Sequence, residues 1–181
     1  MTKMTTTTTM TTTKKRNTIK LRALEPEDAA LLYVVENDVA EWCHTDSLAP
    51  YSYRQLQDFA LTYDPDPFRA GQLRLVVENA EGEAVGLVDL YEISSKNLNA
   101  FIGVTTLPDK RGKGYGLAAV EEMTRYALTT LGLRTVAAKI LSRNRKALDL
   151  FAKAGYVETG LLKDWQRTGE GFEDLVVMQK R

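Results

Sequence analysis

A glycine-rich hexapeptide at residues 111–116 (RGKGYG) combines the residue types best suited to binding an anionic ligand. The apolar residues after it recur at a spacing of roughly 3.6, which predicts a helix over residues 114–131. Alternate glycines let the backbone turn tightly and bring its N–H groups close to a ligand. The first N–H groups of a helix lack partners within it, and the helix dipole adds positive charge there. Residues 111–117 therefore predict a phosphate or pyrophosphate site, to which Arg111 and Lys113 add charge.

Two common phosphate-binding loops do not fit this spacing. A P-loop requires Lys and then Ser or Thr after its last glycine, but Gly114 is followed by Tyr115. The dinucleotide-binding pattern G-x-G-x-x-G would require glycine at Leu117. A plain strand-to-helix turn with two solvated cations remains an alternative reading of the loop.

The composition is that of an ordinary globular protein of 181 residues, long enough for one domain with a real core. Its formal net charge is zero, but residues 1–17 carry four cations and no acid, which leaves the rest at about −4. This distribution gives no reason to expect nucleic-acid binding by the folded part, and it suits a cationic substrate. The single cysteine, Cys43, excludes an intramolecular disulfide and fits a reducing, cytoplasmic compartment. No apolar run reaches membrane-spanning length, so we expect no membrane partner.

The chain divides into a tail and one domain. Residues 1–17 are rich in threonine and end in a basic cluster, without the apolar stretch of a signal peptide. Such a segment cannot bury enough apolar surface to offset its ordering entropy, so we predict disorder there. Residues 18–181 are predicted to form a single domain.

Hydrophobic periodicity, turn residues and capping patterns predict the element order β-α-α-β-β-β-α-β-α-β-β. Ser52 and Gln55 form a capping box, and Asn144 caps the last helix. We expect an α/β fold in which a mixed sheet has helices on both faces, with an antiparallel meander in the middle and a C-terminal hairpin. The predicted strands are 18–22, 72–78, 84–93, 98–106, 134–141, 157–166 and 172–179, and the predicted helices are 26–37, 52–63, 114–131 and 144–153.

Three motifs in this order resemble the GCN5-related N-acetyltransferase (GNAT) superfamily. Arg111, Gly114 and Gly116 match its signature Q/R-x-x-G-x-G/A. Residues 144–156 (NRKALDLFAKAGY) are similar to its N-x-x-A segment and the glycine-aromatic end that follows. The strand at residues 19–22, with an acidic helix start after it, is the third match.

Within the superfamily, the chain most resembles the bacterial spermidine/diamine and the ribosomal-protein N-terminal acetyltransferases. Residues 75–78, 86–90 and 92–93 are similar to the polyamine branch, and residues 160–171 are similar to both branches.

The resemblance implies that the protein uses acetyl-coenzyme A (acetyl-CoA) and no metal. The glycine-rich loop would bind the pyrophosphate, and strand residues 104–106 would lie along the pantetheine. Asn144 is either a cofactor contact or a plain helix cap, and both roles are compatible. The cofactor-binding residues implied are Val104, Thr105, Thr106, Arg111, Gly112, Lys113, Gly114, Tyr115, Gly116, Leu117, Asn144, Lys146 and Phe151.

The resemblance also implies the catalytic candidates. Glu92 matches a glutamate beside the acceptor site of the polyamine branch, where it would accept a proton or hold a cation; an exposed strand-end acid is the alternative. Asp89 is a weaker candidate, because strand alternation places it on the opposite face. Many relatives have a tyrosine at the position of Phe151, whose hydroxyl protonates the leaving thiolate, and phenylalanine cannot do so. Tyr156 carries a hydroxyl nearby and is the second catalytic candidate.

We therefore expect an acetyl-CoA-dependent N-acetyltransferase that acts on a small cationic amine such as a polyamine. The polyamine branch has acids near the positions of Phe101–Ile102 and residues 47–50, which this chain lacks, so spermidine itself is less favoured. A protein N-terminus is the alternative acceptor. A non-catalytic acyl-CoA-binding module is the alternative from another class, motivated by Phe151. The resemblance further implies a homodimer or a larger homo-oligomer.

Overall fold

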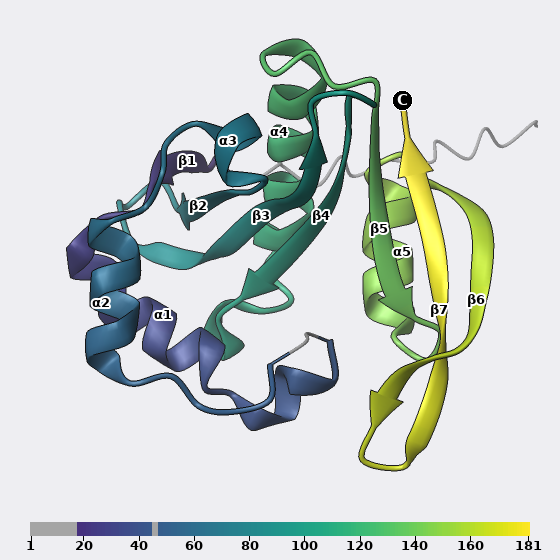
Figure 1. The fold of residues 1–181 in the computed structure, drawn as a ribbon, viewed down its shortest axis with the longest axis horizontal. Helices are drawn as coiled ribbons and strands as arrows, with labels where there is room; N and C mark the ends of the chain where they lie inside the picture. Colours follow the sequence, from purple (N-terminus) through teal and green to yellow (C-terminus); the bar gives the residue numbers. More distant parts are fainter. Residues whose placement is uncertain (1–17, 45–46) are drawn as a thin grey trace, which may run out of the picture.

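Seven strands form one mixed sheet in the order β1-β2-β3-β4-β5-β7-β6 (Figure 1). The computed structural model describes residues 18–44 and 47–181, so the predicted tail at residues 1–17 lies outside the described residues. β4 and β5 pair in parallel and the other neighbours pair antiparallel, which confirms the predicted meander and hairpin. The strands are β1 (Lys20–Ala23), β2 (Leu73–Glu78), β3 (Ala84–Ser94), β4 (Asn99–Thr106), β5 (Thr135–Leu141), β6 (Val157–Thr168) and β7 (Gly171–Lys180).

Helices cover both faces of the sheet, as predicted. On one face, α1 (Ala29–Glu36) and α2 (Tyr53–Leu61) pack against Val76 and Leu87 of the sheet. On the other face, α4 (Tyr115–Thr129) and α5 (Arg145–Lys153) bury the larger apolar cluster with β3, β4, β5 and β7. The larger cluster therefore fixes the positions of α4, which begins at the glycine-rich loop, and of α5, which begins at Asn144.

The helix starts follow the local signals in the sequence. Ser52 Oγ accepts a hydrogen bond from the Gln55 amide, and the Gln55 side chain accepts one from the Ser52 amide, which confirms the capping box. Three short helices among the described residues were not predicted: η2 (Val39–His44), α3 (Pro67–Ala70) and η3 (Pro108–Lys110). Asp66 explains the second, because its side chain accepts hydrogen bonds from the first amides of α3.

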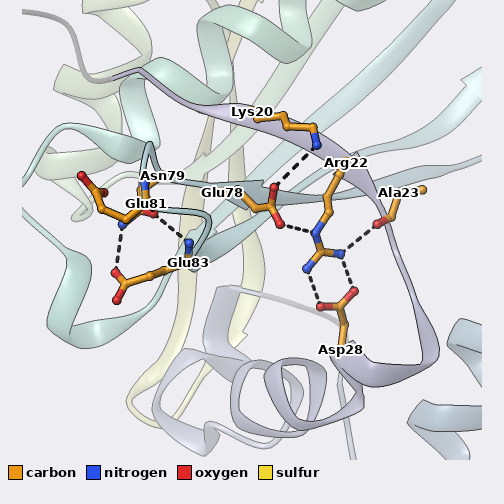
Figure 2. A network of polar contacts seen from close by, with 8 residues as sticks. All are labelled: Lys20, Arg22, Ala23, Asp28, Glu78, Asn79, Glu81 and Glu83. Carbon is orange, nitrogen blue, oxygen red and sulfur yellow. Dashed lines mark hydrogen bonds and ion pairs between the residues drawn. The ribbon is translucent and has the colours of Figure 1, made fainter.

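An ion-pair network fastens the start of the helical layer to the sheet (Figure 2). Arg22 of β1 donates to both carboxylate oxygens of Asp28, at 2.6 and 2.7 Å, and its Nε lies 2.6 Å from Glu78 Oε1. Asp28 ends the helical turn η1 (Pro26–Asp28) and also accepts a hydrogen bond from the Glu25 amide. Since η1 leads directly into α1, the network fixes where α1 crosses the sheet.

No helix within residues 18–44 and 47–181 is long and apolar enough to cross a membrane.

Candidate active site

Strands β4 and β5 separate soon after they meet. Their pairing covers Asn99 to Phe101 on β4, whereas β4 stays paired with β3 as far as Thr106. In the described part of the chain, the edge of β4 from Ile102 to Thr105 has no strand partner on the β5 side. Figure 1 shows the two strands diverging towards the loop that leads into α4. Backbone N–H and C=O groups along that edge are therefore placed to pair with an amide-bearing ligand.

A cavity of about 480 Å³ occupies the opening between these strands. Its walls come from α1, η2, α5 and the strands β2 to β7. Five predicted site residues line it together: Glu92, Val104, Thr105, Asn144 and Phe151. Three elements that are distant in the sequence thus meet at one hollow.

The glycine-rich loop lies at the outer end of β4 and opens α4. Gly112 and Gly114 have φ values of +74° and +91°, in the left-handed region that favours glycine, and Gly114 is the N-cap of α4. A Cβ atom at Gly116 would lie 3.1 Å from Leu150 Cδ1 and 3.3 Å from Thr106 Oγ1, so a larger residue there would require these two side chains to shift. The amides of the first turn of α4 are then directed out of the helix start, as an anion site requires.

The side chains of this loop adjoin the cavity but do not line it. The Nη2 atom of Arg111 lies 3.0 Å from Glu41 Oε1, and this ion pair links the loop to η2. Lys113 is exposed, whereas Tyr115 and Leu117 pack against the larger apolar cluster. Thus the cation at Lys113 is accessible to a ligand, and the two apolar side chains hold the helix start in place.

Helix α5 supplies the opposite wall of the cavity. The Asn144 side chain accepts a hydrogen bond from the Ala147 amide at 3.1 Å, which confirms that Asn144 caps α5. Asn144 also lines the cavity, so the cap is compatible with contact to a ligand there. Phe151 is 4% exposed and faces the same hollow. Lys146 is exposed in the first turn and lies outside the cavity wall.

Tyr156 does not reach the cavity. It is 3% exposed, and its hydroxyl lies 2.6 Å from Thr124 Oγ1 inside the core. Burial raises the pKa of Tyr156 to about 12, and the hydrogen bond with Thr124 opposes that rise. Its ring packs edge-on against Phe151, with 5.1 Å between the ring centroids. This position gives no support to Tyr156 as the proton donor.

Glu92 and Asp89 line the same cavity, so the prediction that strand alternation separates them is wrong. The register of β3 shifts between Tyr91 and Ser94, and Glu92 has a φ of +50°. Such a bulge inserts an extra residue and breaks the period of two. The Glu92 carboxylate then lies 3.0 Å from Lys139 Nζ on β5.

The described residues of the cavity wall include four acids, and each of these has a basic partner. Arg74 bridges Glu36 and Asp89, at 2.5 Å from each carboxylate. Burial disfavours the charge on Arg74, but the two carboxylates outweigh it and raise its pKa. Burial raises the pKa of Asp89, and Arg74 works against that rise. The other two acids are Glu41, paired with the loop arginine, and Glu92.

Sequence reasoning missed Arg74 and Lys139. Each is the only cation in a mainly apolar strand, LRLVVE and TVAAKIL respectively. A cation among apolar strand residues costs free energy unless it is paired, and this signal would have selected both residues.

Residues 18–157 match the model of the acetyltransferase (GNAT) domain, which is more than half of the chain. The chain belongs to the GNAT acetyltransferase family. The resemblance predicted from the three motifs is therefore confirmed.

This GNAT acetyltransferase has curated relatives in both predicted branches. It is 28% identical over 148 residues to the spermidine N(1)-acetyltransferase of Vibrio cholerae, covering 80% of this chain and 82% of that one. It is 27% identical over 172 residues to a putative ribosomal N-acetyltransferase of Bacillus subtilis, covering 90% and 91% of the two chains.

Solved structures of the V. cholerae spermidine N-acetyltransferase share this GNAT fold. One, in complex with CoA and spermine, has a TM-score of 0.80 at 26% identity and covers 90% of this chain and 94% of that chain. Another, a dodecameric structure in an intermediate state, has a TM-score of 0.76 at 27% identity, with 90% and 92% covered. The predicted mixed α/β fold is thus confirmed as the GNAT fold.

Proposed function

We propose that this GNAT acetyltransferase transfers the acetyl group of acetyl-CoA to the primary amine of a small cationic acceptor such as a polyamine. The observation that carries the proposal is the open edge of β4, which faces a cavity that contains Glu92. The complex of a relative with CoA and spermine supports the same donor and acceptor classes here.

The residues present fit acetyl-CoA. Amides at the start of α4 and the cation of Lys113 would hold its pyrophosphate. The edge of β4 at Val104 and Thr105 would pair with the amides of the pantetheine arm, opposite Asn144 and Phe151. The thioester of the bound cosubstrate would supply an activated acyl group.

Each protein group then has one task in acyl transfer. The acceptor amine must be neutral to attack, and Glu92 would accept its proton directly or through a water molecule. A backbone N–H on the edge of β4 would stabilise the negative charge that develops on the acyl oxygen. Phe151 has no proton to give, so the leaving thiolate would take its proton from solvent.

A panel of acceptors tests this function. The purified protein is incubated with acetyl-CoA and with polyamines, diamines, amino acids, aminoglycosides or peptides with free N-termini, and both free thiol and the mass of the product are followed. We expect acetylated polyamine or diamine. Thiol release that no acceptor raises above background would contradict the proposal.

A protein N-terminus is the second candidate acceptor. The internal pairing of the four cavity acids favours it, because paired acids attract a polycation less than free ones. Turnover of peptides but not of polyamines in the same panel would select this function.

We also propose that the chain forms a homo-oligomer, because a relative of the same fold is dodecameric. Size-exclusion chromatography with light scattering gives its mass in solution, and a monomer at every concentration would contradict this proposal.

A further inference from the structure

An aromatic surface lies at the point where β4 and β5 part. Tyr91 and Phe101 are partners across β3 and β4, and their rings stack with centroids 5.7 Å apart. Phe101 is also the last residue of β4 that pairs with β5. The two rings therefore form an apolar surface next to the cavity, and Tyr91 itself lines the cavity.

The ammonium group of Lys139 lies over this surface. Its Nζ atom is 4.0 Å from the centroid of the Phe101 ring and 6.0 Å from that of Tyr91. An ammonium group within about 6 Å of an aromatic face is attracted by the negative charge of that face. The Lys139 side chain is 27% exposed, so it has solvent beside it into which it can move.

Glu92 closes the cation site from a third side. Its carboxylate lies 3.0 Å from Lys139 Nζ. The φ of +50° at Glu92 is costly for a residue with a Cβ atom, and such strain tends to be kept where it serves a site. Here the bulge aims the carboxylate at the ammonium group over the two rings.

We propose that Tyr91, Phe101 and Glu92 form an ammonium-binding site at the wall of the acceptor cavity, which Lys139 fills as a tethered cation until an ammonium group of the acceptor displaces it. The inference rests on the proposed function in that the acceptor enters this cavity. Two stacked rings and one carboxylate are the chemistry that recognises an alkylammonium ion.

Removal of the tethered ammonium tests this site directly. Binding of spermidine, propane-1,3-diamine and propylamine is measured by calorimetry for the wild type and for Lys139→Met. We expect Lys139→Met to bind all three amines about tenfold more tightly, because the competing cation is gone and one ammonium group is enough to fill the site. A gain that rises with the number of charges on the amine would indicate a general charge effect instead. Lys139→Arg, which keeps a cation over the rings, should restore weak binding.

Two further variants separate the site from general charge effects. Lys96→Met removes an exposed lysine of the turn between β3 and β4, outside the cavity wall, and should leave the amine affinities unchanged. Phe101→Leu combined with Lys139→Met should reduce the gain, because the nearer of the two aromatic faces is lost.

The outcomes separate this inference from the proposed function. Equal or weaker diamine binding by Lys139→Met, or an equal gain with Lys96→Met, overturns the inference even if acetylation is observed. Tighter diamine binding by Lys139→Met supports the inference even if neither form acetylates an amine, which would contradict only the proposed function.

Discussion

The hydroxyl of Tyr156 is directed into the core, where it shares a hydrogen bond with Thr124. A group held in this way cannot also protonate a thiolate in the cavity. We expect Tyr156→Phe to keep the turnover number of the wild type and to lower the free energy of unfolding by about 1 kcal/mol, the usual worth of one hydrogen bond. Steady-state kinetics and urea denaturation measure the two effects, and a hundredfold loss of turnover would show that Tyr156 acts in catalysis.

Phe151 gives the opposite expectation, because it lines the cavity. Phe151→Tyr adds a hydroxyl at the position where the resemblance to the family implies a proton donor, and an added general acid should raise turnover about a hundredfold. The rate is measured with saturating acetyl-CoA and the best acceptor of the panel. An unchanged rate would contradict this expectation. Tight CoA binding with no turnover in either the wild type or the variant would instead favour the non-catalytic binding module.

At the scale of the element, the start of α4 depends on glycine in the left-handed region. Alanine at Gly114, where φ is +91°, costs about 1–2 kcal/mol, and a loop that relaxes to relieve this strain no longer directs its amides at one point. We expect Gly114→Ala to raise the Kd for acetyl-CoA about tenfold.

Gly132 provides the matched control for this loop. It lies beyond the other end of α4 with a φ of +68°, and no atom lies within 4 Å of the position of an added Cβ. Gly132→Ala should lower the stability by a similar amount and leave the Kd for acetyl-CoA unchanged, as measured by calorimetry. Equal weakening by both substitutions would mean that the loop acts only through stability.

Most helices and strands were predictable because the residues that indicate where they start and end lie within a few positions of one another in the sequence. The capping box at Ser52 and Gln55 and the cap at Asn144 need only neighbours three residues away, and both are confirmed. The glycines of the loop are likewise explained by their own backbone angles and by close packing. The expectation that residues 104–106 lie along the pantetheine came only from the resemblance to a family.

The inner wall of the site was not predictable in the same way. A glutamate with positive φ has no local sequence signal, and the bulge at Glu92 changed the face on which its side chain lies. The pairs Arg74–Asp89 and Lys139–Glu92 depend on strand order and register, since their members are 15 and 47 positions apart. One residue of register shift would separate them.

At the scale of the whole molecule, the sheet has two parts that join at the short β4–β5 pairing. The larger apolar cluster runs across this junction, from Val88 and Ile102 on one side to Ile140 and Val176 on the other. This shared core supports the pairing of β4 and β5 at Asn99–Phe101, and the two strands separate beyond that pairing. The cavity therefore depends on both parts of the sheet being folded.

The ion pair of Arg22 and Asp28 is expected to control stability in acid. Burial alone would raise the pKa of Asp28, but the hydrogen bonds from Arg22 and from the Glu25 amide outweigh it and lower the pKa below its ordinary value of 3.8. A depressed pKa in the folded state contributes stability above pH 3.8, and that contribution is lost as the pH falls through the lower value. The carboxylate therefore stabilises the fold at neutral pH.

Asp28→Asn keeps the shape of the side chain but removes its charge, so it should lower the free energy of unfolding by about 2 kcal/mol at pH 7. Urea denaturation at pH values from 7 down to 3 measures the difference from the wild type. This difference should shrink below pH 3.8, where the unfolded chain binds a proton at Asp28 and the folded protein, with its lower pKa, does not yet do so. Glu27→Gln, at the exposed neighbouring position, is the matched control and should change stability little at any pH. A difference between wild type and Asp28→Asn that stays constant over this range would mean that the charge on Asp28 does not hold α1 to the sheet.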